Sequence, residues 1–270
     1  LTFYNGYYKV KYPFGKLDVV AVPDFAAGAM ENTAAIFYRE NDLLADSRLR
    51  HRYAFWLFSY DSGNPIAYSG WKLRDALAQA VDRADPNGSD PCARAMVVLG
   101  HSQGGLLTKL TAIDSGDIFW KGLSSQPFDE VKLARDDKEL LRNVAFVKPL
   151  PFVTEVIFLA TPQRGSYLAG PQIVRRLAEA LVRLPSDVVR VSAAAATQVP
   201  TGSGDMALRS IPTSIDNMSP GNRFIQALAK SPVTPGVRAH SIISVKDDAP
   251  LSSAGDGVVK YESAHVDGVE

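Results

Sequence analysis

The sequence predicts an α/β protein with a doubly wound, mostly parallel sheet. Apolar runs with the length of buried strands lie at residues 53–60 (YAFWLFSY), 95–99 (AMVVL) and 153–160 (VTEVIFLA). Segments with apolar residues at helical spacing lie between these runs, and strands that alternate with helices are typical of parallel sheets. A fourth strand is expected at 237–245 (VRAHSIISV).

Helices are expected after these strands. Residues 69–84 repeat apolar side chains at helical spacing, and Ser69 is available as an N-cap. Residues 103–113 show a similar apolar face, and residues 171–184 run from one proline to another. Ser219 and Pro220 are expected to open a further helix.

Three other segments do not fit this alternation. Two short strands are predicted at 17–22 and 34–39, on either side of a Gly/Ala-rich loop. The stretch 115–152 mixes charged and turn residues, which indicates an excursion from the sheet. The small-residue segment 192–205 belongs to predicted lid material at about 166–215.

Composition limits the possible partners and chemistry. The 270 residues are 46% hydrophobic and carry 29 basic and 29 acidic side chains, so no basic excess points to nucleic acid. No apolar segment is long enough to span a membrane, and the first residues do not form a signal-peptide pattern. The single cysteine, Cys92, excludes an intrachain disulfide, and only four histidines are present. Oligomeric state and cellular compartment are not predicted.

A serine motif gives the strongest chemical signal. Gly100-His101-Ser102-Gln103-Gly104 stands between an apolar strand and a helix. A strand that turns sharply into a helix holds the serine in a strained backbone conformation, and glycines on either side avoid collisions. The pattern predicts Ser102 as a nucleophile, with the Gln103 amide stabilising an oxyanion.

An activated serine needs a base, which follows the serine in chain order in this architecture. His240 and His265 follow Ser102, but His240 lies within a predicted strand. His265 lies in a C-terminal loop and is therefore the candidate base.

The acid that orients this base is expected between the two. Asp256 follows the fourth predicted strand in a Ser/Gly/Asp loop, and Asp247 and Asp248 are the alternatives. No cofactor or metal is expected for this chemistry.

Residues 53–270 resemble the lipase/esterase branch of the α/β-hydrolase superfamily, akin to the inositol-deacylase-like serine esterases. The stretches that carry the resemblance are YAFWLFSYDSGNPI, VVLGHSQGG, VIFLATPQRGS, SPGNRFIQAL and GDGVVKYESAH. The resemblance implies hydrolysis of a small-molecule or lipid ester through an acyl-enzyme on Ser102, with Asp256 at the acid position.

Two departures from that family motivate an alternative. The chain has no His-Gly pair to donate the second oxyanion N–H, and it ends at Glu270 before the Gly-His-Ser-type segment in which relatives place their histidine. The alternative is a hydrolase-fold fragment that is impaired or inactive because its catalytic histidine is missing.

Residues 1–50 instead resemble gluzincin zinc aminopeptidases around their GAMEN motif, here Gly28 to Asn32. In those enzymes the glutamate of this loop, here Glu31, grips the free amine of the substrate. Their zinc-binding H-E-x-x-H helix is absent, and no two histidines are four residues apart. A zinc aminopeptidase fragment is therefore the remote alternative.

The two resemblances together predict a chimera. An aminopeptidase-like segment, residues 1–50, is joined to an α/β-hydrolase domain, residues 51–270. In this interpretation the N-terminal segment packs on an exposed sheet edge. The alternative is that both similarities belong to one family.

Overall fold

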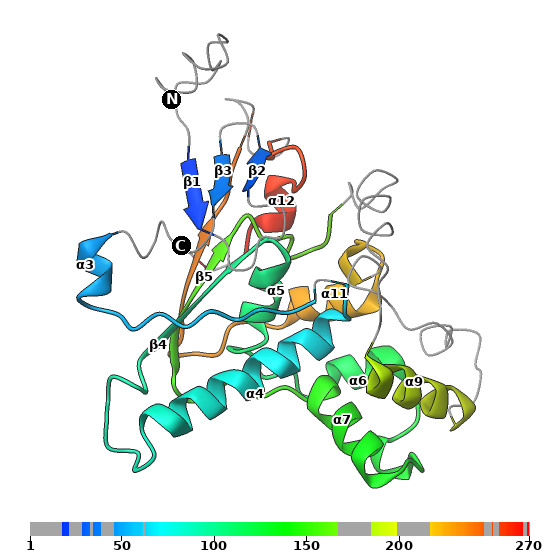
Figure 1. Ribbon diagram of the computed structural model, residues 1–270. Helices are drawn as coiled ribbons and strands as arrows, with labels where there is room; N and C mark the ends of the chain where they lie inside the picture. The colour runs from blue at the N-terminus through cyan, green and yellow to red at the C-terminus, as the bar shows by residue number, and fades with distance from the viewer. Residues whose placement is uncertain are drawn as a thin grey trace. The chain divides into compact units, whose positions relative to one another are not determined.

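The computed structural model describes most of the chain (Figure 1). The described residues are 46–61, 63–166, 185–198, 217–245, 250, 254–266 and 269, together with the backbone of 18–21, 29–32 and 35–38. They divide into two compact units, residues 1–59 with 246–248 and residues 60–245 with 249–270. The predicted boundary at residue 50 between an aminopeptidase-like and a hydrolase part stays a prediction.

The first unit contains a three-stranded sheet. Strands β1 (Asp18–Ala21) and β3 (Ala35–Tyr38) run parallel, and β2 (Ala29–Asn32) pairs antiparallel with β3, giving the order β1-β3-β2. Both predicted strands are therefore present. The third strand was expected to be part of a loop, because its sequence AMEN has little β-propensity of its own.

A short helix closes the described part of this unit. Helix α3 (Ser47–Arg50) begins at Asp46, whose side chain accepts a hydrogen bond from the N–H of Arg48 at 2.8 Å. The guanidinium of Arg48 also donates a hydrogen bond to the carboxylate of Asp46, and it lowers the pKa of Asp46 to about 2. Asp46 therefore satisfies an end of the helix that lacks internal partners.

The second unit is built on a parallel sheet. Strands β4 (Met96–His101), β5 (Val153–Leu159) and β6 (Arg238–Ile242) lie in the order β4-β5-β6. These three strands confirm the expected runs at 95–99, 153–160 and 237–245.

The doubly wound sheet predicted from the sequence is wrong for the described residues. The strand order follows the chain in one direction, whereas a doubly wound sheet reverses its order at a switch point. The run 53–60 forms no strand, and Tyr53, Trp56 and Leu57 are more than two-fifths exposed. Aromatic residues favour strands only where a sheet surface receives them, so an aromatic run does not by itself determine a strand.

Three expected helices are present with different ends. Helix α4 (Ile66–Ala84) begins after Pro65, so Ser69 is a buried interior residue and not the N-cap. Helix α5 (Gln103–Lys109) stops before the predicted end at residue 113. The helix expected from Ser219 is α11 (Arg223–Lys230).

The actual cap of α11 is Asn222. Its side-chain oxygen accepts a hydrogen bond from the N–H of Phe224 at 2.8 Å, so the helix begins after Asn222 and not at Ser219 and Pro220. The helix predicted at 171–184 lies outside the described residues, as does most of the predicted lid at 166–215.

The stretch 115–152, which was predicted as an excursion from the sheet, forms helices. It contains α6 (Ile118–Leu123), the 3₁₀-helix η1 (Phe128–Glu130) and α7 (Arg135–Ala145). The remaining described helices are α9 (Ser186–Gln198) and α12 (Tyr261–Ala264).

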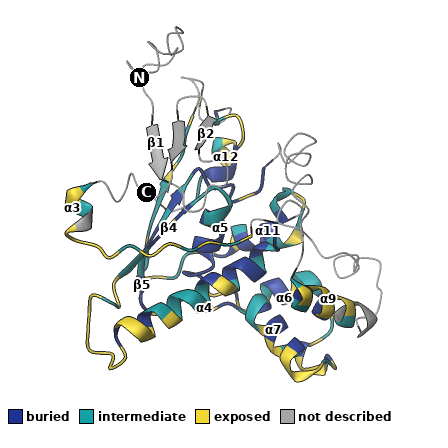
Figure 2. Cartoon of the chain, in the orientation of Figure 1, coloured by how far each residue is buried: buried dark blue, intermediate teal, exposed yellow. Residues whose placement is uncertain are grey.

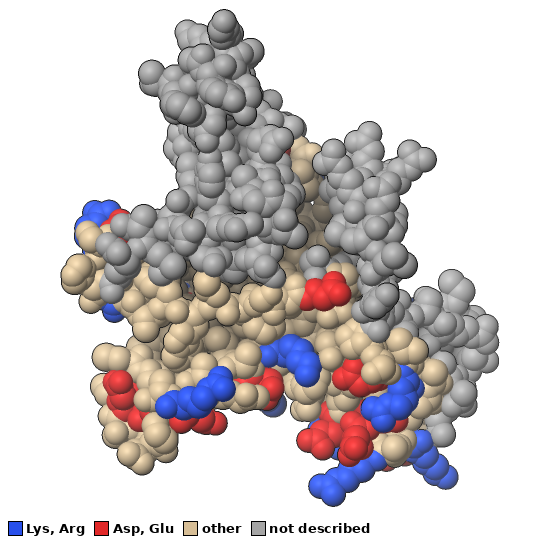
Figure 3. All heavy atoms as spheres, viewed as in Figure 1, with Lys and Arg blue, Asp and Glu red and all other residues tan. Residues whose placement is uncertain are grey.

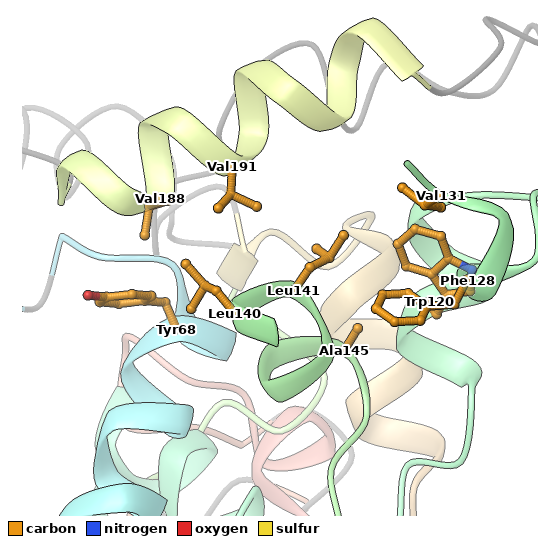
Figure 4. Close-up of a cluster of buried hydrophobic side chains, with 9 residues drawn as sticks. All are labelled: Tyr68, Trp120, Phe128, Val131, Leu140, Leu141, Ala145, Val188 and Val191. Carbon is orange, nitrogen blue, oxygen red and sulfur yellow. The ribbon is translucent and has the colours of Figure 1, made fainter. Parts of the chain in front are cut away.

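Two clusters of buried apolar side chains support the second unit, and Figure 2 shows where burial is concentrated. The sheet core consists of Val81, Val98, Ala112, Phe152, Val153, Val156 and Phe158. The helical core consists of Tyr68, Trp120, Phe128, Val131, Leu140, Leu141, Ala145, Val188 and Val191 (Figure 4). The helical core joins side chains from α4, α6, η1, α7 and α9.

None of the described helices combines the length and apolar composition needed to cross a bilayer. Basic and acidic side chains lie intermixed on the face shown in Figure 3, in agreement with the zero net charge. The expected absence of a membrane-spanning helix is thus found in the described residues.

Candidate functional site

The turn between β4 and α5 places Ser102 in an unusual backbone conformation. Ser102 has φ 50° and ψ −122°, a combination that L-residues rarely adopt. The Ser102 N–H donates to the carbonyl of Leu159 at 2.9 Å, and its own carbonyl accepts from the N–H of Gly105 at 3.0 Å. These two bonds hold the strained residue between β5 and the first turn of α5.

The glycines around Ser102 differ in how strongly the structure requires them. A Cβ atom on Gly100 would lie 2.4 Å from the carbonyl oxygen of Gly104, and one on Gly105 would lie 1.8 Å from Thr161 Oγ1. Among the described residues, a Cβ atom on Gly104 would meet only Tyr60 Oη, at 3.9 Å. Gly100 and Gly105 are therefore needed for close packing, whereas Gly104 is not.

Asp256 acts as a turn residue. Its Oδ1 atom accepts hydrogen bonds from the N–H groups of Val258 and Val259, each at 2.7 Å. Gly257, which follows Asp256, has φ 92°, and this conformation suits glycine in a tight turn. The carboxylate thus stabilises its own loop.

His265 directly follows α12. Its ring stacks on Tyr261 with centroids 5.6 Å apart, and its carbonyl accepts a hydrogen bond from Arg164. Within the described residues, no hydrogen bond joins the side chains of Ser102, Asp256 and His265. The catalytic roles of these three residues stay a prediction, and so does the oxyanion role of the Gln103 amide.

The other histidines have separate surroundings. His240 on β6 is within 3.0 Å of Glu155 Oε1, and Arg238 also bonds this carboxylate and lowers its pKa. Burial lowers the pKa of His101 to about 4, so this side chain is neutral at pH 7. Asp247 and Asp248, the alternative acids, lie outside the described residues.

A buried lysine close to the serine turn escaped prediction. Lys109 is the last residue of α5, and only 1% of its surface is exposed. Burial, followed by the nearby charge of Arg164, lowers its pKa to about 8. A lysine on a helix that carries Leu106, Leu107 and Leu110 gives no sequence signal that distinguishes it from a solvated one.

No described group of residues is suited to a metal. The structure brings together no set of three His, Cys, Asp or Glu side chains that could hold an ion, in the part of the chain that it describes. The four histidines at 51, 101, 240 and 265 cannot supply two ligands from one helical turn.

Comparison with known proteins gives matches concentrated at the N-terminus. Residues 1–54 match the model of the peptidase family M1 domain. Endoplasmic reticulum aminopeptidase 2 from Bos taurus is 56% identical over 48 residues, which is 18% of this chain and 5% of the relative. Aminopeptidase M1-C from Oryza sativa subsp. japonica is likewise 56% identical over 48 residues, or 6% of its length.

A third relative extends further along the chain. Aminopeptidase N from Mus musculus is 27% identical over 166 residues, covering 55% of this chain and 16% of the relative. The chain therefore spans only a small part of these aminopeptidases. No solved structure matches.

These matches overturn the interpretation as a serine esterase or lipase of the α/β-hydrolase fold. They point to peptidases and not to carboxylic ester hydrolases, and they support the alternative that the sequence favoured least. The error arose from weight given to short motifs, because a strand–turn–helix with a strained serine specifies a backbone shape and not a reaction. The resemblance of residues 1–50 to zinc aminopeptidases is confirmed.

Proposed function

We propose that the first unit of the chain recognises the free amino terminus of a peptide, as an M1 aminopeptidase does with its substrate. The observation that carries this proposal is the match of residues 1–54 to the peptidase family M1 domain. The named relatives are aminopeptidases, and the matched segment contains the Gly28–Asn32 run.

The chemistry of Glu31 suits this role. Glu31 lies in β2, where its register partner on β3 is Ile36. A carboxylate forms strong charge-assisted hydrogen bonds with an ammonium group, and an α-amine of a peptide is such a group at pH 7. A strand also holds a binding residue more rigidly than a loop does.

The residues present do not fit the zinc ion of this peptidase family. The sequence holds no pair of histidines four residues apart, and the described residues contain no metal-binding cluster. The proposal is therefore limited to recognition of the peptide amine, and no hydrolytic step is assigned to these residues.

Peptide binding tests the proposal directly. A tetrapeptide labelled at its carboxyl end is titrated with the full chain by fluorescence anisotropy, with a free or an acetylated amino terminus. The free amine should bind at least about tenfold more tightly, because hydrogen bonds to charged groups contribute about 1.5–3 kcal/mol. Glu31→Gln should remove this preference.

Glu40→Gln, in the same matched segment, is the control and should keep the preference. Equal affinities of the two peptides for the unmodified chain would refute the proposal. Retention of the preference in Glu31→Gln would refute the role of Glu31. Metal analysis is expected to find no stoichiometric zinc in the purified chain.

A further inference from the structure

Helix α9 packs onto the rest of the second unit through few side chains. Of residues 186–194, the part of the helix whose side chains the structure describes, only Val188 and Val191 are buried. Both point from α9 toward the other helices of the helical core (Figure 4), whereas the neighbouring Val189 is exposed. Helix α9 therefore buries a narrow apolar stripe.

The helices beneath α9 are tied to the interior at more positions. Helix α7 contributes Leu140, Leu141 and Ala145 to the helical core, and α4 contributes Tyr68 to that core and Val81 to the sheet core. Segments that bury few apolar side chains open at a lower free energy than the core of a protein does. Helix α9 is therefore expected to open before α4 and α7.

The contact between α7 and α9 includes a buried carboxylate. Asp137 on α7 is 5% exposed, and Nη2 of Arg190 on α9 lies 2.9 Å from its Oδ1 atom. This geometry gives Oδ1 no hydrogen bond, and among the described residues Arg190 is the only ion-pair partner of Asp137. An unpaired charge is costly inside a protein, so the docked state depends on this pair. Detachment of α9 removes the partner but also opens the carboxylate to water, so the intact pair opposes detachment only weakly.

A single hydrogen bond between described side chains joins α9 to α4. The Tyr68 hydroxyl donates to Asp187 Oδ2 at 3.3 Å, which is longer than most O–H···O hydrogen bonds. Burial, followed by the charge of Asp187, raises the pKa of Tyr68 to about 12, so the hydroxyl remains a donor at neutral pH. The contacts of α9 with α4 and α7 thus combine two valines with two polar contacts of modest strength.

We propose that α9 is a strap that detaches reversibly from α4 and α7 while the rest of the second unit stays folded, with Asp137 and Arg190 as its latch. Detachment uncovers the apolar surface of Tyr68, Leu140 and Leu141, toward which the valines of α9 point (Figure 4). The strap goes beyond the proposed peptide recognition and uses residues of the second unit alone.

Hydrogen exchange of the full chain, followed by mass spectrometry under native conditions, tests the strap. A helix of 13 residues is only marginally stable by itself in water, so the amides of α9 are protected only while it is docked. Interior amides of α9 should exchange at least about tenfold faster than interior amides of α7. Equal protection of the two helices would overturn the proposal, because α9 and α7 would then open together.

Arg190→Met tests the latch, with Arg142→Met as the matched control. Both arginine side chains are 57% exposed, but Arg142 pairs with Asp129, which is itself 91% exposed. Methionine and arginine have similar helix propensities, so neither variant weakens its helix directly. Arg190→Met should speed the exchange of α9 at least about tenfold relative to β5, because Asp137 stays buried without its partner. Arg142→Met should leave the exchange of α9 unchanged.

A double variant separates the charge from the packing of α9. Asp137→Leu combined with Arg190→Met should restore the protection of α9 to at least that of the unmodified chain, since an apolar side chain replaces the unpaired carboxylate. The latch is refuted if Arg190→Met speeds the exchange of α9 no more than Arg142→Met does. It is also refuted if the double variant exchanges as fast as Arg190→Met alone.

Discussion

The sheet core and the helical core of the second unit bury similar side chains, but they differ in how readily the sequence predicts them. The sheet core draws on β4 and β5, each of which is recognisable in the sequence as one mainly apolar segment. The helical core collects one to three side chains from each of several short helices between residues 68 and 191. A buried strand can be predicted from a local apolar run, whereas a core assembled from short amphipathic helices depends on contacts that no single segment reveals.

The aromatic content of the helical core sharpens this difference. The Phe128 ring packs edge-on against Trp120 with centroids 5.1 Å apart and against Phe146 at 5.0 Å. The charged ends of Lys138 and Arg142 lie over the same ring, at 5.5 Å and 4.9 Å from its centroid. The charged and turn residues of the stretch 115–152 predicted an excursion from the sheet and not these helices.

Replacement of one phenylalanine in each core compares the two directly. Phe158→Ala should lower the free energy of unfolding by about 3–5 kcal/mol, because Phe158 is fully buried in the middle strand β5. Phe128→Ala should cost less, about 2–3 kcal/mol, because its ring is 8% exposed at the surface of η1. Urea denaturation measures both, and an equal or larger loss in Phe128→Ala would reverse the ranking of the cores.

A control for both variants is Ile242→Ala. Ile242 lies on β6 and is 58% exposed, so its truncation should change stability by less than about 0.5 kcal/mol. A larger loss would show that the exposed face of β6 is covered in solution.

Two neighbouring glycines test the contact between α5 and the end of β5, next to the sheet core. Gly105→Ala should destabilise the protein by about 1–3 kcal/mol, since the new methyl group would overlap Thr161. Gly104→Ala should instead be neutral or stabilising by up to about 1 kcal/mol, because the site is open and alanine favours a helix.

Thr161→Gly should suppress much of the loss caused by Gly105→Ala, and a double-mutant cycle in urea measures this coupling. Losses that simply add would mean that α5 does not approach Thr161 as closely as the structure shows.

Removal of the backbone strain at Ser102 should give a smaller change in stability than the core replacements, and of opposite sign. Ser102→Gly should stabilise the protein by about 1 kcal/mol, because glycine adopts a positive φ without steric cost. Ser186→Gly, at an exposed position at the start of α9, should not stabilise. Thermal unfolding measures both, and a loss of stability in Ser102→Gly would contradict the strain.

The ion pairs at the sheet surface give the smallest effect. Arg238 and then His240 hold the pKa of Glu155 below its ordinary value of 4.5. A carboxyl whose pKa is lowered on folding stabilises the protein above its unfolded pKa, and this contribution is lost as the pH falls through the folded value. Glu155→Gln should therefore cost less than about 1 kcal/mol at pH 7 and nothing near pH 2.

The pH series on Glu155→Gln is compared with that of a control variant. Glu139→Gln, at an exposed position on α7, is the matched control for the loss of one acidic side chain. A difference between Glu155→Gln and the unmodified chain that persists at pH 2 would assign the effect to packing and not to charge.

Prediction from sequence succeeded where local pattern determines the outcome. The strands β4, β5 and β6, the helix α4 and the sharp turn at Ser102 all follow from neighbouring residues. It failed for the run 53–60, whose aromatic residues favour a strand only beside another strand. It also failed for the fold as a whole, since strand order depends on contacts between distant segments.

The candidate site shows the same limit at the level of side chains. Gly100 was recognisable as tightly packed, because glycine beside a strand–helix turn has a steric cause, but the second close contact falls on Gly105 and not on the predicted Gly104. The proposed assembly of Ser102 with Asp256 and His265 required side-chain directions that spacing does not give. The Asp256 side chain instead accepts hydrogen bonds from the backbone of its own loop, as aspartate often does in turns.

The parallel pairing of β4, β5 and β6 also affects how the chain reaches its final structure. Val98 pairs with Val156, and Glu155 pairs with Arg238, so the partners are about 60 and about 80 positions apart in the sequence. Each pairing must close a long loop before any ladder bond forms, whereas α4 and α7 can form from neighbouring residues alone. The sheet is therefore expected to form late and slowly during folding, and its strand edges are exposed to other chains until β5 is enclosed by both neighbours.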